Sequence, residues 1–244
     1  MSVIDKFIKV RQNKEKFCSA VIVAAGNSQR MGKDKILMRI NDKPVIAYTL
    51  EVFQNSDCID EIIVVTKHDN IAVMADICAE YGITKTAKVV CGGKTRAESS
   101  LAGVLSVSEN ASLIAIHDGA RPFVTGSVIE RCVAAVEDNS AAAPATSAID
   151  TVRILNKKGA VTSTPDRNFV ALVQTPQVFN AAVIKNALTK AVEKNLPITD
   201  DCSAVEAMGV KVSIVSGDPD NIKLTTARDV YMAERIIQER SEAK

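Results

Sequence analysis

The chain has 244 residues, 47% hydrophobic and 24% charged, which is enough to bury a sizeable core and is typical of a globular protein. Thirty basic residues balance 29 acidic ones, and a net charge of +1 gives no bulk attraction for nucleic acid or an anionic membrane. Aromatic residues make up 4% of the chain and tryptophan is absent, which disfavours stacking of single-stranded nucleic acid. We therefore expect neither a nucleic-acid partner nor a membrane partner.

The cysteines and the N-terminus indicate a cellular compartment. Six cysteines are scattered without a Cys-x-x-Cys pair, and we expect free thiols. The two histidines disfavour a zinc site. No run approaches the roughly 18 consecutive apolar residues of a membrane span, and the N-terminus lacks a signal-peptide core followed by a cleavage site. These features predict a cytoplasmic protein.

Residues 1–17 form an N-terminal extension before the first predicted strand. Apolar residues and lysines mix there at loosely helical spacing, which predicts a short amphipathic helix packed on the body or on a neighbouring subunit. The continuous apolar run at 21–23 then predicts a strand buried on both faces of a parallel sheet.

A loop of small and cationic residues follows that strand. Ala24, Ala25 and Gly26 remove side-chain bulk, so backbone N–H groups can approach a polyphosphate while long cationic side chains close over it. A solvated basic turn is the alternative from this stretch alone. Spacing excludes both the P-loop and the dinucleotide-binding glycine pattern. The cations are Arg30, Lys33 and Lys35.

Strands and helices alternate through the first half of the chain, which predicts a doubly wound, mostly parallel α/β sheet. Such sheets bind ligands outside the carboxyl ends of their strands, so the loops at 26–35, 92–99 and 117–121 should converge on one crevice. We expect strands at 61–66, 88–91 and 113–116, and helices at 44–54, 69–81, 95–107 and 127–137.

The pattern changes after residue 140. A hairpin with strands at 150–155 and 160–164, joined by a polar turn with glycine, lies outside the alternating repeat and predicts a protruding arm at 147–170. We expect further strands at 141–145, 169–179 and 210–215, and helices at 181–194, 200–208 (capped by Thr199) and 226–240, all within a single domain of residues 1–244.

Asp118 ends a predicted buried strand and is followed by a Gly-Ala pair that lets a ligand come close. A carboxylate in that position suits Mg²⁺, which proteins usually hold with one or two carboxylates plus substrate phosphates. Local sequence alone equally allows a turn-capping aspartate.

Several motifs together resemble one family. Ala-Ala-Gly at 24–26, Arg-Met-Gly at 30–32 and a lysine before Lys-Pro-Val at 43–45 resemble the loop of nucleotidyltransferases that act on sugar phosphates. The closest resemblance is to the 2-C-methyl-D-erythritol 4-phosphate cytidylyltransferases of the non-mevalonate route to isoprenoids. Counting back from Lys43 selects Lys35 as the family lysine, with Lys33 as the competitor. Further matches are GGKTRAES at 92–99, HDGARP at 117–122 and DNIKLT at 220–225.

The resemblance implies a Rossmann-like nucleotidyltransferase fold with a β-hairpin arm, a homodimer with composite sites, and Mg²⁺ or another divalent cation. It assigns catalysis to Arg30, Lys35 and Lys223, and metal binding to Asp118 and Asp220. CTP binding is implied for Ala24, Ala25, Gly26, Gly93, Ser99 and Asp118. Binding of the polyol phosphate is implied for Arg121, Asp150, Thr151, Arg167 and Thr175.

The implied reaction is in-line attack of a phosphate monoester on the α-phosphorus of CTP, which gives a CDP-alcohol and pyrophosphate. A phosphate monoester has its second pKa near ~6, so the reaction needs no general base. Ribitol 5-phosphate as the alcohol, a non-catalytic nucleotide-binding regulator and a dinucleotide-dependent dehydrogenase are the alternatives. The missing glycine fingerprint disfavours the last.

Overall fold

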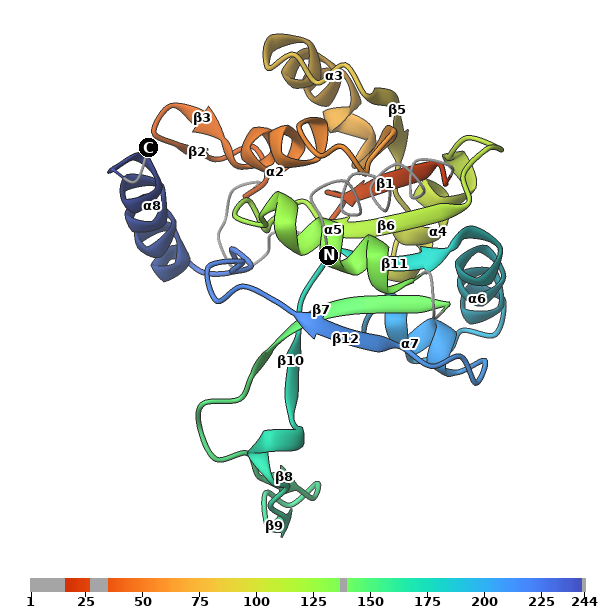
Figure 1. Ribbon diagram of the computed structural model, residues 1–244, viewed down its shortest axis with the longest axis vertical. Helices are drawn as coiled ribbons and strands as arrows, with labels where there is room; N and C mark the ends of the chain where they lie inside the picture. The colour runs from red at the N-terminus through yellow and green to blue at the C-terminus, as the bar shows by residue number, and fades with distance from the viewer. Residues whose placement is uncertain (1–15, 27–34, 137–139, 243–244) are drawn as a thin grey trace, which may run out of the picture.

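The computed structural model describes residues 16–26, 35–136 and 140–242 (Figure 1). The described residues form a central eight-stranded sheet in the order β10-β7-β11-β6-β1-β4-β5, with β12 also paired to β7. Strands β1 (Cys18–Val23), β4 (Glu61–Thr66), β5 (Thr86–Cys91) and β6 (Leu113–Asp118) are parallel neighbours. This arrangement confirms the doubly wound α/β prediction. The expected N-terminal helix falls on residues outside the described ranges.

Alternating side chains of these strands form two separate cores, one on each face of the sheet. On one face, Ala20 and Ile22 pack with α2 (Val45–Gln54), α3 (Ile71–Glu80) and α5 (Gly126–Ala135). Val21 points to the opposite core, which α4 (Arg96–Ser106), α6 (Ala181–Glu193) and α7 (Asp201–Glu206) cover. Because both faces are covered, the strands are apolar on both sides, as the sequence predicted.

The other half of the sheet is mixed. Strand β7 (Ala141–Ser147) runs parallel to β12 (Ser213–Ser216) and antiparallel to β10 (Ala171–Val173) and β11 (Gln177–Asn180). The single strand expected at 169–179 is interrupted: nine residues from Ala171 to Phe179 run opposite seven from Ser147 to Ala141. The two extra residues form a bulge around Thr175 and Pro176, and a bulge redirects a side chain locally.

The arm is present and projects from the body at the far ends of β7 and β10 (Figure 1). Its hairpin strands, β8 (Ile154–Leu155) and β9 (Val161–Ser163), are shorter than expected, and the short helix η3 (Arg167–Phe169) follows. The Asn156 side-chain oxygen accepts hydrogen bonds from the N–H groups of Lys158 and Ala160, and Gly159 takes the positive φ of +79° that this turn requires.

Several boundaries differ from the sequence predictions, and four of them bear on the site or its supports. Pro44 belongs to β3 (Lys43–Pro44), which pairs with β2 (Arg39–Ile40) in a hairpin that we did not predict, so α2 begins one residue later. Asn41 and Asp42 make its turn with positive φ. The sequence signal for the hairpin was this Asn-Asp pair, since both residue types tolerate positive φ in tight turns. Asp200, not Thr199, caps α7, because its carboxylate accepts from Ser203 N–H. Strand β6 extends through His117 and Asp118, and β12 begins at Ser213.

Helices η2 (His68–Asn70) and α8 (Ala227–Glu242) complete the described secondary structure. Helix η2 follows β4, and α8 packs on the β2–β3 hairpin through Ile40, Ala233 and Ile236. All six cysteines are free, as expected. None of the helices in the described part of the chain combines the length and the apolar character of a membrane span.

The tight contact between α4 and the sheet yields a stability prediction. A Cβ at Gly103 would lie 2.3 Å from Val21 Cγ1 and 2.7 Å from Val65 Cγ2. Because overpacking typically costs about 1–3 kcal/mol, Gly103→Ala should lower the free energy of unfolding, measured by urea denaturation. Gly126→Ala is the matched control, since that helical glycine faces open space and alanine should stabilise it by up to about 1 kcal/mol. Equal stabilities of the two variants would contradict this packing.

Candidate active site

A pocket of about 400 Å³ lies at the carboxyl ends of β1, β4 and β5. It is bounded by Ala25 and Gly26 after β1, by Lys67 and His68 after β4, and by the segment that leads into α4. Of the three loops expected to converge, those at 26–35 and 92–99 line this pocket in their described parts, and the loop at 117–121 meets it through the contact of Arg96 with Asp118. The Arg30 and Lys33 positions lie outside the described residues, and Lys35 lies where the described chain resumes.

Close packing of small residues shapes this pocket. A Cβ at Gly92 would lie 2.5 Å from Ala25 Cβ and 2.8 Å from Ser99 Oγ, so only glycine allows the two loops to approach this closely. Thr95 and Glu98 form a capping box at the start of α4, which fixes the loop. Ser99 Oγ donates to Thr95 O at 2.9 Å and accepts from Gly93 N–H at 3.2 Å. Ser99 and Gly93 thus lie together on the pocket wall.

Asp118 is the centre of a second cluster, at the end of β6. Its carboxylate contacts Lys223 Nζ at 2.8 Å, Arg96 Nη2 at 3.4 Å and Arg121 Nε at 3.7 Å. Burial alone raises the pKa of Asp118, but the three cations outweigh it and hold the pKa well below its usual range. Asp118 is therefore ionised at neutral pH.

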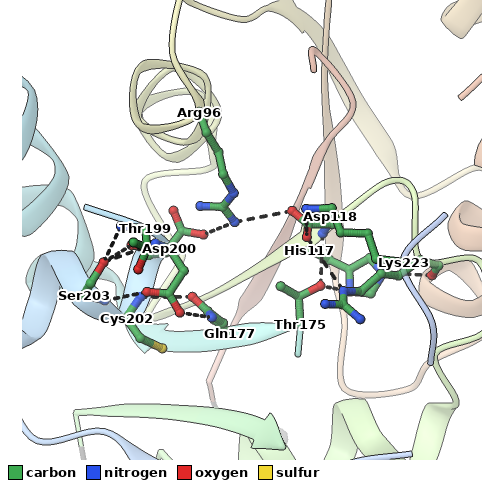
Figure 2. A network of polar contacts seen from close by, with 12 residues as sticks. Arg96, His117, Asp118, Thr175, Gln177, Thr199, Asp200, Cys202, Ser203 and Lys223 are labelled. Carbon is green, nitrogen blue, oxygen red and sulfur yellow. Dashed lines mark hydrogen bonds and ion pairs between the residues drawn. The ribbon is translucent and has the colours of Figure 1, made fainter. Parts of the chain in front are cut away.

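A chain of hydrogen bonds fixes the backbone beneath this carboxylate (Figure 2). His117 Nε2 lies 3.1 Å from the Arg121 carbonyl, which can only accept, so Nε2 carries the proton and Nδ1 accepts from Thr175 Oγ1 at 3.0 Å. Thr175 Oγ1 in turn accepts from the Asp118 N–H at 3.1 Å. Burial lowers the pKa of His117 to about 4, which keeps the ring neutral. The bulge in the β10–β11 segment thus places Thr175 beside Asp118.

The loop before α8 brings Lys223 to the same cluster. Arg121 Nη1 donates to Asn221 O at 2.7 Å, and Leu224 N–H donates to Ala120 O at 2.9 Å. Asn221 is completely buried and donates to Thr175 O at 2.9 Å. These bonds join the turn after β6 to the loop at 220–225, which explains why two segments about a hundred residues apart share one site.

Arg96 connects the pocket with the Asp118 cluster. Its Nη2 atom lies 2.7 Å from Asp201 Oδ2 and 3.4 Å from Asp118 Oδ1, so one guanidinium spans two carboxylates. Figure 2 shows Arg96 extending from α4 between Asp118 and the group at the start of α7. Asp201 was not predicted from the sequence, because nothing in Thr-Asp-Asp at 199–201 distinguishes a functional carboxylate from a helix cap.

Comparison with known proteins identifies the family. The model of the family IspD, 2-C-methyl-D-erythritol 4-phosphate cytidylyltransferase, matches residues 18–239. The chain belongs to this family. The cytidylyltransferase of that name from Clostridium botulinum is 40% identical over 222 residues, covering 90% of this chain and 97% of that protein. The one from Alkaliphilus oremlandii is 37% identical over 229 residues, covering 93% and 97%.

Solved structures agree. The crystal structure of 4-diphosphocytidyl-2C-methyl-D-erythritol synthase from Anaerococcus prevotii superposes with a TM-score of 0.85 at 32% identity, covering 93% of this chain and 99% of that one. The structure of 2-C-methyl-D-erythritol 4-phosphate cytidylyltransferase from Thermus thermophilus has a TM-score of 0.73 at 27% identity, covering 89% and 98%.

The structure divides the residues implied by the family resemblance into two groups. Ala24, Ala25, Gly26, Gly93 and Ser99 lie at or beside the pocket, and Asp118, Arg121, Thr175 and Lys223 form the adjacent cluster. Asp150, Thr151 and Arg167 lie exposed on the arm, where Arg167 Nη1 donates to Ile149 O at 3.0 Å. No contact described within this chain joins them to Asp118.

The carboxylates around the Asp118 cluster decide whether a divalent cation fits the site. Among residues 16–26, 35–136 and 140–242, no three His, Cys, Asp or Glu side chains gather as a metal cage. Asp220 is exposed and its N–H donates to Asp218 Oδ1, so no described contact brings it to Asp118. One ionised carboxylate fits a magnesium ion that takes its other ligands from water and substrate phosphates. A metal role for Asp118 or Asp220 stays a prediction for this cytidylyltransferase.

The buried histidine yields a pH prediction. His117 has an ordinary pKa of 6.5 when unfolded and about 4 when folded, so between these pH values the unfolded chain binds a proton that the folded chain does not. In metal-free buffer, the free energy of unfolding should fall by roughly 3 kcal/mol as pH drops from 6.5 to 4. The Asp118 carboxylate adds to the loss of stability only below this pH range, since its stabilising effect is lost as pH falls below the ordinary pKa of an aspartate.

Urea denaturation across this pH range measures the effect. His117→Asn should make the free energy of unfolding less dependent on pH. His68→Asn, at an exposed side chain, should leave this pH dependence unchanged. The same slope in His117→Asn and in the original chain would show that other groups cause the loss.

Proposed function

We propose that this protein joins CTP and 2-C-methyl-D-erythritol 4-phosphate to give the CDP-alcohol and pyrophosphate. The family match over residues 18–239 carries the proposal. The site supports it, because a pocket lined by glycines adjoins a cluster in which Arg96, Arg121 and Lys223 surround Asp118. The regulator and dehydrogenase alternatives have no comparable support.

The residues present suit nucleotidyl transfer. This reaction needs positioning and fixed positive charge more than covalent chemistry, and Lys223 and Arg96 supply that charge beside the pocket. The substrate phosphate is largely ionised at neutral pH and attacks without a general base. His117, buried and with both ring nitrogens hydrogen-bonded, is therefore a structural support for Asp118. We assign Arg30 and Lys35 to the triphosphate by family resemblance.

Mg²⁺ is the cofactor that we propose. Asp118 would hold it together with substrate phosphates, with Asp220 as a second candidate. Bound there, the ion would supply Lewis-acid charge that neutralises the phosphates.

CTP is the proposed nucleotide because the pocket wall is made of small residues and backbone. Ala25, Gly92, Gly93 and Ser99 approach one another closely, which favours a pyrimidine over a larger purine. Gly93 and Ser99 would read the edge of cytosine with backbone and hydroxyl groups.

The polyol phosphate site would need a second copy of the chain. Asp150, Thr151 and Arg167 lie on the arm at 147–170, and two arm side chains are almost fully exposed: Ile149 at 85% and Phe169 at 89%. Exposed apolar side chains on a projecting element favour burial against another subunit. We therefore propose a homodimer of single nucleotidyltransferase domains, 1–244, in which each arm completes the partner's site. The free thiols fit the reducing cytoplasm.

The function is tested by pyrophosphate release from CTP with a panel of polyol phosphates and Mg²⁺. We expect turnover with methylerythritol phosphate, at least tenfold lower kcat/KM with ribitol 5-phosphate, and little turnover with ATP or GTP. Ribitol 5-phosphate is the weaker candidate, because the relatives described above carry the methylerythritol name. Equal turnover of CTP and ATP would refute the assignment of the pocket to a pyrimidine nucleotide. Preference for ribitol 5-phosphate would refute methylerythritol phosphate as the alcohol substrate.

Assigning Arg167 on the arm to the alcohol phosphate predicts a change in KM for that substrate but not in KM for CTP. Arg167→Ala removes one cation from a site for a dianion, so it should cost roughly 2–4 kcal/mol of transition-state binding, expressed in KM for the alcohol phosphate. KM for CTP should not change. Arg153→Ala is the matched control: that exposed arm arginine bonds Thr164 Oγ1 and has no assigned substrate role. A raised KM for CTP with an unchanged KM for the alcohol phosphate would reverse the proposed division.

A further inference from the structure

Asp201 is a buried charge that helix capping does not explain. It is the first residue of α7 and is 0% exposed. The neighbouring Asp200 caps the helix through Ser203 N–H, so the Asp201 carboxylate is not needed there. Its Oδ1 atom has no hydrogen-bond partner among the described residues, although it is buried. Burying a carboxylate is costly unless it is paired, so its pairing with Arg96 at 2.7 Å is what stabilises it.

The start of α7 is held rigidly against the sheet. Gln177, 1% exposed on β11, donates to Asp200 Oδ2 at 2.7 Å and accepts from Cys202 N–H at 2.9 Å. These two bonds lie on either side of Asp201 in the sequence and fix its backbone (Figure 2). Asp201 is therefore a preorganised anchor, and Arg96, with its longer side chain, is the partner that can adopt more than one position.

Arg96 experiences two competing attractions. The same Nη2 atom contacts Asp201 at 2.7 Å and Asp118 at 3.4 Å. Without the Asp201 charge, Asp118 would be the only carboxylate of the described residues in contact with Arg96, and the guanidinium would close on it. Asp118 would then be less available to a cation, and Arg96 would leave the pocket wall that it lines.

We propose that Asp201 is a positioning residue for the nucleotide half of the site, which holds Arg96 at the pocket and away from full pairing with Asp118. The inference rests on the proposed function, since it identifies what sets the affinity for CTP and its metal. It assigns no contact between Asp201 and substrate.

The test measures kinetics and binding for Asp201→Asn, a change of charge at nearly constant size. KM for CTP and the Mg²⁺ concentration for half-maximal rate should each rise about tenfold, while KM for the alcohol phosphate should stay within twofold. Calorimetric titration with CTP and Mg²⁺, without the alcohol phosphate, should show the same loss of affinity. Asp201→Glu, which keeps the charge, should recover most of it.

Ser203→Ala is the matched control, because it removes the reciprocal half of the α7 capping box and leaves both Gln177 bonds and the Arg96 contact with Asp201 in place. It should lower the melting temperature but leave both KM values unchanged. An equal rise of KM for CTP in Ser203→Ala and Asp201→Asn would mean that α7 integrity alone matters, which overturns the proposal.

A double-mutant cycle with Arg96→Gln tests whether Asp201 acts through Arg96. In the Arg96→Gln background, Asp201→Asn should raise KM for CTP no further. The double variant leaves no buried charge unpaired, so it should fold even if Asp201→Asn alone does not, and it should keep the tenfold higher KM. Additive effects, or a double variant with the original KM, would overturn the inference. Absence of CTP turnover in the unmodified enzyme would instead refute the proposed function.

Discussion

Asp118 carries a negative charge while only 8% exposed, and such a charge is costly unless cations compensate it. The compensating groups come from three parts of the chain: Arg96 from α4, Arg121 from the turn after β6, and Lys223 from the loop before α8. No other part of the described site joins so many segments. The local fold must keep all three within reach of one carboxylate, and this constraint explains much of the surrounding detail.

The supporting interactions act on the backbone rather than on the charges. His117, Thr175 and the Asp118 N–H form one chain of hydrogen bonds, and Asn221 joins Thr175 to the Lys223 loop. Each of these groups is buried and has a defined donor or acceptor role, so the arrangement has little freedom. A neutral histidine is required for it, because protonated Nδ1 could not accept from Thr175. The site's geometry and the stability of the fold are therefore coupled.

Local patterns predicted the sheet and its ligand edge well, because buried parallel strands are continuous apolar runs and their carboxyl ends share one edge. Non-local pairing was not predictable from a single sequence. The bulge at Thr175 depends on the register between β10–β11 and β7, and the function of Asp201 depends on its distance from Arg96. Asp150, Thr151 and Arg167 were selected by family resemblance alone, and no contact described within one chain joins them to Asp118.

The charges of the described cluster indicate what the rest of the site must provide. Arg96, Arg121 and Lys223 contribute three positive charges, while Asp118 and Asp201 contribute two negative ones. The surplus is small beside a nucleoside triphosphate and a phosphate monoester, which alone carries about −1.5 to −2 at neutral pH. Further positive charge is therefore needed when both substrates bind. We expect this charge to come from the loop cations Arg30 and Lys35 and from a divalent ion. Because Asp201 binds Arg96, the guanidinium pairs only partly with Asp118 and stays available to the substrates.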